Sequence, residues 1–341
     1  MQSGRSTTLS EVARRAGVSL TTASKAINGQ ARVSDEARAR VLKAARELAY
    51  TPNRIARSLM SGRTGTVGLV VVDSDAQRFV LPILLGAEEA LSEIDLSMTV
   101  SDARGDRARL RRIVERFAER QVDGVLVVGD NNTPTPRVGR LLGQPVVYVY
   151  GETGVAADVV HVPDDQGGAR EVTEHALAGG RRRIAVITGP EEARAVQERG
   201  RGIAAALREA GLPLAHEVLH GQWSQRSGRV LAERLLAKTP DVDAIVCGSD
   251  QIATGVAEAL RGAGLRVPQD VAITGFDNWP IFALESDPPL TTVDMNLHTL
   301  GAAAVRDLFD MIDGRPVGGG VRLHRCAVLV RSSTATASAG S

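Results

Sequence analysis

Two spacings of hydrophobic residues divide the chain. Up to about residue 50, apolar positions recur every three to four residues, which predicts short helices. From Thr66 onward, short runs that are apolar throughout alternate with amphipathic stretches, which predicts parallel strands covered by helices on both faces. The expected strands cover residues 67–72, 98–100, 125–128, 146–149, 159–162, 184–187, 244–247 and 271–275, and the clearest helices cover 106–121, 194–210, 224–236 and 251–263.

The first segment predicts two helices joined by a tight turn. Thr8 and Glu11 stand three residues apart, the spacing of a capping box that begins a helix. Gly17 stands where the chain reverses, because glycine tolerates the positive φ of such a turn. Ser19 begins a second helix whose outer side carries hydroxyls, an amide and Lys25 but no carboxylate. Such a helix fits a DNA major groove, although similar patterns also arise by chance in all-helical proteins.

Two more helices follow the first pair. Ser34 caps a third helix, which supplies the apolar face that covers the first two. Pro52 interrupts the helical pattern, and Asn53 can begin a short cationic helix that ends at Gly62. Because so short a helix is marginal in isolation, a plain linker is the competing interpretation.

Composition narrows the class of protein. The 341 residues are 43% hydrophobic and 24% charged, which is typical of a globular chain with two or three domains. No apolar run approaches the roughly 20 residues that span a bilayer, and the N-terminus lacks a signal-peptide pattern. We therefore expect a cytoplasmic protein with no membrane partner. Its two cysteines and six histidines show no disulfide or metal-ligand spacing, and phosphate-loop, dinucleotide and hydrolase motifs are missing. We expect no metal, no cofactor, no catalytic residue and no enzyme.

Charge is distributed unevenly along the chain. Residues 1–63 hold 12 basic and four acidic residues, a net charge of +8, whereas the remainder holds 29 basic and 36 acidic residues, a net charge of −7. General solubility does not require a basic segment on an acidic body. The distribution instead indicates a module that binds a polyanion such as DNA, with affinity from counterion release at phosphates.

Polar and aromatic residues follow several of the expected strands. In open parallel sheets, ligands bind beyond the carboxyl ends of the strands, so these residues are candidates for a pocket. They are Asp73, Tyr150, Ser249 with Asp250, and Asp277 with Asn278 and Trp279.

Each candidate has a structural alternative. Ser249 or Asp250 can cap the following helix, and Asp277 can belong to a turn. Arg199 can lie on a solvated helix face, and Trp223 can be a core residue.

The order of these segments resembles the LacI/GalR family of bacterial transcription regulators, from about Thr8 to Arg331. The resemblance rests on TLSEVARRAGVSLTTASKAING, RVSDEARARVLKAARELAYTPNRIARSL, GLVVV, GPEEARAVQERGRG, SDQIATG, DVAITGFDNWP and PPLTTV. It implies an α/β body like a periplasmic sugar-binding protein, with an effector between two lobes. It also implies a homodimer that matches a pseudo-palindromic operator.

The resemblance also implies domain boundaries. A helix-turn-helix head covers residues 1–50, a hinge helix or linker 51–63, and the body 64–331. Within the body, lobe 1 covers about 64–162 and 294–318, and lobe 2 about 163–290 and 323–331. The chain is expected to cross between lobes near 162–164, 290–294 and 318–323, and the composition of residues 332–341 indicates a disordered tail.

The resemblance assigns DNA contacts to three groups of residues. In the second helix, Leu20, Thr21 and Lys25 read bases, with Lys25 where many relatives carry arginine. Phosphate and register contacts come from Ser19, Thr22, Ser24 and Asn28. The hinge helix contributes Asn53, Arg54, Ala56 and Leu59, and Leu59 is expected to wedge into the minor groove.

In the body, Arg199 and Asp277 match the family's usual effector-binding pair. A guanidinium and a carboxylate can grip neighbouring sugar hydroxyls, while Trp223 or Phe79 covers the apolar face of the sugar. The chain departs from the family pattern at Asp73 to Phe79, at Tyr150 and at Ser249, where asparagine-proline-phenylalanine, aspartate and asparagine are frequent. The expected effector residues are Asp73, Phe79, Tyr150, Arg199, Trp223, Ser249 and Asp277.

Together these features predict a transcriptional repressor whose operator affinity is set by a small effector, a carbohydrate in the leading interpretation. A purine, nucleoside or phosphorylated effector, including a co-repressor, is the alternative within the same class. A solute-binding protein or an enzyme on the same lobes is disfavoured by the missing signal sequence and catalytic motifs.

Overall fold

The computed structural model describes residues 7–27, 33–50, 63–73 and 77–334. Contacts divide the chain into two compact units, Met1–Gly65 and Thr66–Ser341, called here the head and the body. Each unit has its own apolar core.

Three helices form the described part of the head: α1 (Leu9–Ala16), α2 (Leu20–Ile27) and α3 (Asp35–Glu47). The capping box at Thr8 and Glu11 is confirmed, and Gly17 takes the left-handed conformation with φ 67°. Ser34 caps α3 by accepting a hydrogen bond from the Ala37 amide. The core that the three helices enclose is small and consists of Val12, Ala13, Ala16, Ala23, Ala26, Val41 and Ala44.

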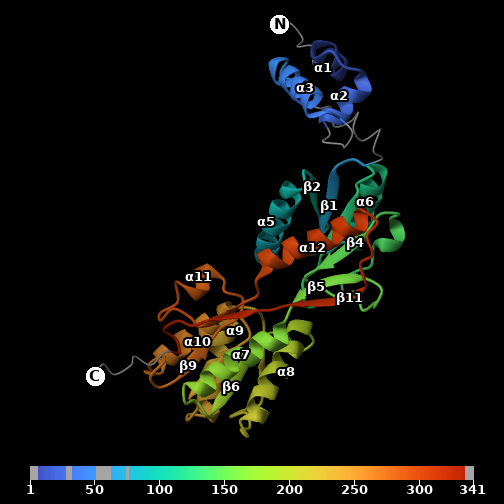
Figure 1. The fold of residues 1–341 in the computed structure, drawn as a ribbon. Helices are drawn as coiled ribbons and strands as arrows, with labels where there is room; N and C mark the ends of the chain where they lie inside the picture. Colours follow the sequence, from blue (N-terminus) through green and yellow to red (C-terminus); the bar gives the residue numbers. More distant parts are fainter. Residues whose placement is uncertain (1–6, 28–32, 51–62, 74–76, 335–341) are drawn as a thin grey trace, which may run out of the picture. The chain divides into compact units, whose positions relative to one another are not determined.

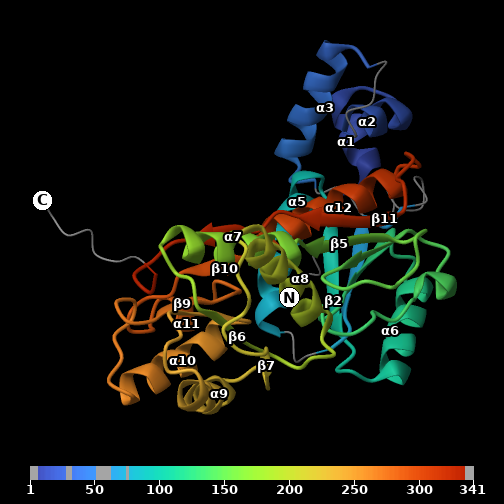
Figure 2. The same cartoon turned by 90° about the horizontal axis from the view of Figure 1, so that it is seen from below.

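The first lobe of the body is built on a parallel six-stranded sheet with the order β11-β5-β4-β3-β1-β2. Helices α5 and α12 pack side by side on one face, and α6 covers the other face (Figures 1 and 2). The elements are β1 (Thr66–Val71), α5 (Gln77–Glu93), β2 (Ser97–Asp102), α6 (Arg107–Glu119), β3 (Gly124–Val128), a 3-10 turn (Gly139–Leu141), β4 (Val146–Val149), β5 (Val159–Pro163), α12 (Leu297–Ile312) and β11 (Gly320–His324).

The second lobe has a parallel four-stranded sheet with the order β7-β6-β8-β9. The pair α7 and α8 covers one face and the pair α9 and α10 the other. The elements are α7 (Asp165–Ala178), β6 (Ile184–Thr188), α8 (Arg194–Glu209), β7 (Leu219–His220), α9 (Gln225–Lys238), β8 (Ala244–Cys247), α10 (Asp250–Gly262), β9 (Ala272–Thr274) and α11 (Pro280–Ala283), with the antiparallel pair β10 (Thr292–Asp294) and β12 (Ala327–Leu329) beside them. The predicted fold class, a helix-turn-helix head followed along the chain by two lobes with parallel sheets, is confirmed.

Glycines allow the paired helices to pack with their backbones in close contact. A Cβ on Gly86 of α5 would collide with the carbonyl oxygen of His298 in α12, and one on Gly301 of α12 with that of Ile83 in α5. The pair α9 and α10 repeats this reciprocal arrangement through Gly228 and Gly255. In the pair α7 and α8, Gly202 lies equally close to the backbone of α7. Each helix pair is therefore interlocked backbone to backbone.

Two sequence expectations about the end of the chain are wrong. The third crossing between lobes was expected near 318–323, but Gly320–His324 pairs with β5 in the first lobe, so the crossing follows His324. The tail was expected to begin at residue 332, yet Ser333 is fully buried and its hydroxyl donates to the Ile273 carbonyl at 2.6 Å. Residues 335–341 lie outside the described part of the chain.

Candidate functional site

The second helix of the head presents its polar side chains outward. Ala23 and Ala26 are buried against α1 and α3, whereas Ser19, Leu20 and Thr21 are exposed. Leu20 is 54% exposed, so its side chain is accessible for contact. The other candidates on this helix, Thr22, Ser24 and Lys25, are partly buried. The six described candidates therefore lie off the core of the head, and a groove-binding helix requires that placement.

The start of this helix is fixed by its own side chains. The Ser19 hydroxyl accepts a hydrogen bond from the Thr22 amide at 3.1 Å, and the two hydroxyls lie 2.8 Å apart. This N-cap positions the first turn, whose amides and hydroxyls can contact phosphates. The remaining DNA candidates, Asn28, Asn53, Arg54, Ala56 and Leu59, lie outside the described residues.

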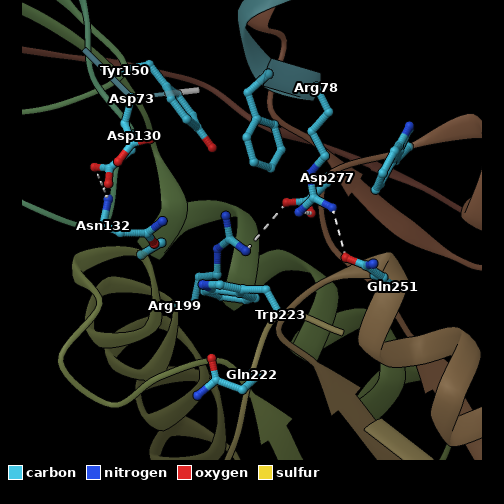
Figure 3. A pocket seen from close by; sticks show the side chains of 13 residues that line it. Asp73, Arg78, Asp130, Asn132, Tyr150, Arg199, Gln222, Trp223, Gln251 and Asp277 are labelled. Atoms are coloured by element: carbon cyan, nitrogen blue, oxygen red, sulfur yellow. Dashed lines mark hydrogen bonds and ion pairs between the residues drawn. The ribbon is translucent and has the colours of Figure 1, made fainter. Parts of the chain in front are cut away.

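In the body, a cavity of about 850 Å³ lies between the two lobes (Figure 3). Several of its residues follow the carboxyl ends of strands, as the sequence predicted. Six of the seven predicted effector residues contribute to its walls: Asp73, Phe79, Tyr150, Arg199, Trp223 and Asp277.

Arg199 extends from α8 and is 4% exposed. Its Nε donates to Asp165 Oδ1 at 2.7 Å, and its Nη1 donates to the Gly248 carbonyl at 2.6 Å. The guanidinium carbon lies 3.6 Å from the centre of the Phe276 ring, a cation–π contact. These contacts leave the guanidinium with a fixed orientation at the wall of the cavity.

Asp277 follows β9, and its backbone φ is 103°, a value that residues other than glycine rarely adopt. Its Oδ2 accepts from Arg78 Nη2 at 2.9 Å, while its Oδ1 lies 3.6 Å from Arg199 Nη1. Among the described residues, Oδ1 is buried without a hydrogen-bond partner. Burial raises the pKa of Asp277 to about 6, and Arg78 followed by Arg199 opposes that rise.

Aromatic rings form much of the remaining wall. Tyr150 is 2% exposed, and its ring centre lies 5.2 Å from that of Phe79. Burial raises the pKa of Tyr150 well above its ordinary value, so the phenol stays neutral. Trp223 packs against Gly189, where a Cβ would collide with the indole. Such rings can cover the apolar face of a ligand.

Ser249 is not among the residues that form the cavity. It is fully buried, and its hydroxyl accepts from the Ile252 amide at 3.2 Å, so it caps α10. The neighbouring Asp250 accepts from the Trp279 amide at 2.7 Å and from the Thr292 hydroxyl at 2.5 Å. Burial raises the pKa of Asp250 to about 8, with the nearby Asp277 as the second cause. Asp250 thus holds Trp279, a residue of the cavity wall, while Ser249 stabilises the start of α10.

Sequence reasoning missed several residues of the cavity. Two of them, Asp130 and Asn132, follow the third expected strand, and the rule that identified Asp73 would have found them. Contributions from connecting segments and helices, which no strand-end rule identifies, come from Arg78, Ala195, Gln222 and Gln251, whereas Trp279 was among the strand-end candidates and does line the cavity.

Direct contacts also join the lobes beside the cavity. Asn131 of the first lobe donates to Asp165 Oδ2 at 2.7 Å, and the Arg194 amide donates to the Asn132 carbonyl at 3.1 Å. Arg194 Nη1 also donates to Asn131 Oδ1 at 3.1 Å, and its Nη2 pairs with Glu152. The lobes therefore meet through polar groups near the cavity.

The described residues contain neither a metal-binding cluster nor a membrane-spanning helix. No group of three or more histidine, cysteine, aspartate or glutamate side chains in that part of the chain could hold a metal ion. None of the helices described is both long and apolar enough to cross a membrane.

Comparisons with known proteins cover both units. Residues 8–53 match the model of bacterial regulatory proteins of the lacI family, and residues 173–334 match the periplasmic binding protein-like domain. The transcriptional regulator CelR of Thermobifida fusca is 36% identical over 92% of this chain and 94% of its own length. The transcriptional repressor CytR of Escherichia coli K12 is 29% identical over 96% of both chains.

A solved structure agrees with these matches. The complex of the transcriptional regulator CelR with cellobiose superposes with a TM-score of 0.69 at 34% identity, covering 96% of this chain and 99% of that one. Since the similarity extends through both the head and the body, the chain belongs to the LacI family of bacterial transcription regulators.

Proposed function

We propose that the chain is a repressor whose affinity for its DNA operator is controlled by a neutral carbohydrate bound between the lobes of the body. The observation that carries the proposal is the Oδ1 atom of Asp277, a buried carboxylate oxygen that has no hydrogen-bond partner among the described residues. A buried acceptor of this kind is costly unless a ligand donates to it. A sugar hydroxyl is a suitable donor.

The surroundings of Asp277 favour a polyol. Arg199 can donate to one sugar hydroxyl while Asp277 accepts from its neighbour, and Trp223 supplies an aromatic face. The 850 Å³ volume is near the upper end of the roughly 300–1,000 Å³ typical of ligand pockets, which leaves room for more than one sugar unit.

The charge of the cavity argues against an anionic effector. Its walls carry three carboxylates, from Asp73, Asp130 and Asp277, and two guanidinium groups, from Arg78 and Arg199. A phosphorylated ligand would meet a net excess of negative charge. A neutral sugar avoids that repulsion.

Control of DNA binding follows from linkage. An effector that contacts both lobes stabilises the conformation of the body to which it binds more tightly. If the two conformations of the body differ in operator affinity, the effector changes that affinity by no more than the difference in its own binding free energy between them. Like the regulators of its family, the chain is expected to act in the cytoplasm as a homodimer, with Leu20, Thr21 and Lys25 of each copy at one operator half-site.

A thermal-shift screen tests the proposal. Neutral mono- and disaccharides, sugar phosphates and nucleosides are compared on the full chain and on Asp277→Asn, which keeps the shape but removes the charge. A ligand at 100 times its Kd adds about 2.7 kcal/mol to stability, a readily measured rise in melting temperature. We expect a neutral sugar to stabilise the wild type and not the variant. Stabilisation only by nucleosides or phosphates, or a sugar response that survives in the variant, would refute the proposal.

A further inference from the structure

Arg78 reaches from one lobe to the other across the cavity (Figure 3). It is the second residue of α5 in the first lobe, yet its Nη2 donates to Asp277 Oδ2 at 2.9 Å and its Nη1 to Gln251 Oε1 at 3.3 Å, both in the second lobe. The side chain is 18% exposed and that of Asp277 is 2% exposed. The ion pair is therefore largely shielded from water. In such surroundings, solvent weakens the attraction between the two charges less than it does at the surface.

Two aromatic rings hold the guanidinium in place. Its central carbon lies 4.3 Å from the centre of the Phe79 ring and 4.5 Å from that of Trp279, one ring from each lobe. A flat, delocalised cation can contact two ring faces and still direct its N–H groups in its own plane. The rings thus set the direction from which Arg78 approaches Asp277.

The two oxygens of Asp277 have different surroundings. Oδ2 is held by Arg78, while Oδ1 is left without a hydrogen bond among the residues described. The ion pair with Arg78 fixes the plane of the carboxylate, so that one of its two oxygens always faces Arg78 and the other remains available for a hydrogen bond.

We infer that Arg78 is a positioning residue for the effector: by binding Oδ2 from the opposite lobe, it keeps the Asp277 carboxylate charged and its Oδ1 available to a ligand hydroxyl. The inference rests on the proposed function for the identity of the ligand, but the state of Asp277 can be measured without any ligand.

The charge of Asp277 depends on several groups that surround it. Arg78 of α5 and Arg199 of α8 favour the ionised form, whereas Asp165 of α7 and the burial of the site disfavour it. Asp250 of α10 and the neutral Tyr150 also lie close enough to interact with Asp277. Burial already raises the pKa of Asp277 to about 6 with both arginines present, so loss of Arg78 is expected to leave it largely protonated at neutral pH.

Arg194 offers a matched control. Its side chain is 23% exposed and it also joins the lobes, but through Asn131 and Glu152 rather than Asp277. If Arg78 acted only by fastening the lobes together, loss of either arginine would affect Asp277 in the same way.

The first experiment is a pH titration of the Asp277 side-chain carboxyl carbon by NMR. The full, ligand-free chain carries ¹³C-labelled aspartate, and Asp277→Asn identifies the signal. We expect a midpoint near pH 6 in the wild type. In Arg78→Met the midpoint should rise by about 1–3 pH units, the effect of removing a close opposite charge. Arg194→Met should leave it in place.

Two more variants distinguish loss of the Arg78 charge from a folding defect. Arg78→Gln is a second neutral substitution and should raise the midpoint as Arg78→Met does. Arg78→Lys restores the charge and should bring the midpoint back toward the wild-type value. A midpoint unchanged in both neutral variants, or raised equally in Arg194→Met, would overturn the inference.

Cellobiose serves as the probe for the ligand side. Its affinity for the wild type should fall as the pH drops through about 6, and in Arg78→Met the fall should begin at a higher pH. Failure of cellobiose to bind the wild type at any pH would count against this ligand and not against Arg78, whose role the NMR titration decides on its own. Binding to Arg78→Met with the wild-type pH profile would contradict the role of Arg78.

Discussion

The head and the body place the side chains predicted to bind DNA and effector in opposite surroundings. In the head, Leu20 and Thr21 point into solvent from a helix whose only buried residues are two alanines. In the body, Arg199 and Asp277 are almost completely buried and are held by residues from several elements. We therefore expect the exposed candidates of the head to be replaceable without loss of the fold, whereas each buried candidate of the body is also part of the packing.

Lys25→Ala is expected to have the largest effect on function with the smallest effect on the fold. If Lys25 reads a base, its loss should weaken operator binding by roughly 1–3 kcal/mol, about 5- to 150-fold, and relax sequence preference. The melting temperature and the ligand response should not change. Fluorescence anisotropy with operator and scrambled DNA measures the first effect, and calorimetry the second. Equal weakening on both DNAs would assign Lys25 to phosphate contact instead.

In the body, the variant Gly189→Ala adds one methyl group next to Trp223 of the cavity wall and should disturb both packing and ligand binding. The Cβ of Gly189→Ala would collide with the Trp223 indole, so the ring must move. We expect a loss of about 1–3 kcal/mol of stability, the usual effect of overpacking, together with a shift in tryptophan fluorescence and weaker ligand binding.

Gly200→Ala is the matched control for this change. Its Cβ meets no atom within 4 Å, and it lies within α8, where alanine is favoured over glycine by about 0.5–1 kcal/mol. This variant should leave fluorescence and binding unchanged. If Gly189→Ala behaved in the same way, fold and function would be as separable in the body as in the head.

The third effect, on stability and not on binding, concerns pH and again distinguishes the two units, because all six histidines lie in the body. His161 is 2% exposed and contacts His324 at 2.9 Å and Asp307 at 3.0 Å. Burial lowers its pKa from 6.5 to about 4. The folded body therefore binds fewer protons than the unfolded chain between these values, and the stability contributed by neutral His161 is lost as the pH falls through this window.

A variant isolates this contribution from the buried carboxyl groups. Burial raises the pKa of Asp250 and Asp277, which makes their effect opposite in sign, so wild type and His161→Gln must be compared at each pH. From pH 7 to pH 4.5, the wild type should lose on the order of 1–3 kcal/mol more than the variant, measured by urea unfolding. Parallel curves would show that His161 contributes nothing to the acid sensitivity.

The sequence predicted best what depends on local spacing. The capping box at Thr8, the turn at Gly17 and the outward face of α2 follow from residues a few positions apart, and the structure confirms them. The apolar strands β1, β3, β5, β6 and β8 were equally visible because both of their faces are buried. By contrast, β11 was missed because it is an edge strand with exposed Val321 and Leu323, and its partner β5 lies about 160 residues earlier.

The cavity was predicted only in part for a similar reason. Strand ends identified Asp73, Tyr150 and Asp277, because the carboxyl ends of parallel strands converge. Arg78 follows no strand directly, and its partner Asp277 is 199 positions away, so its role becomes visible only when both lobes are in place. For Ser249, sequence could not decide between a cap and a ligand contact, since both need a hydroxyl at the end of β8.

The glycine contacts between paired helices also determine how the body can change shape. A helix that rests backbone to backbone on its neighbour cannot slide without driving Cα atoms into carbonyl oxygens, so each pair is expected to translate and rotate as one piece. Any opening of the lobes is then confined to three short connections, after β5, after β10 and after β11. We therefore expect an effector to change the backbone torsions of these three connections while each lobe moves as a rigid body.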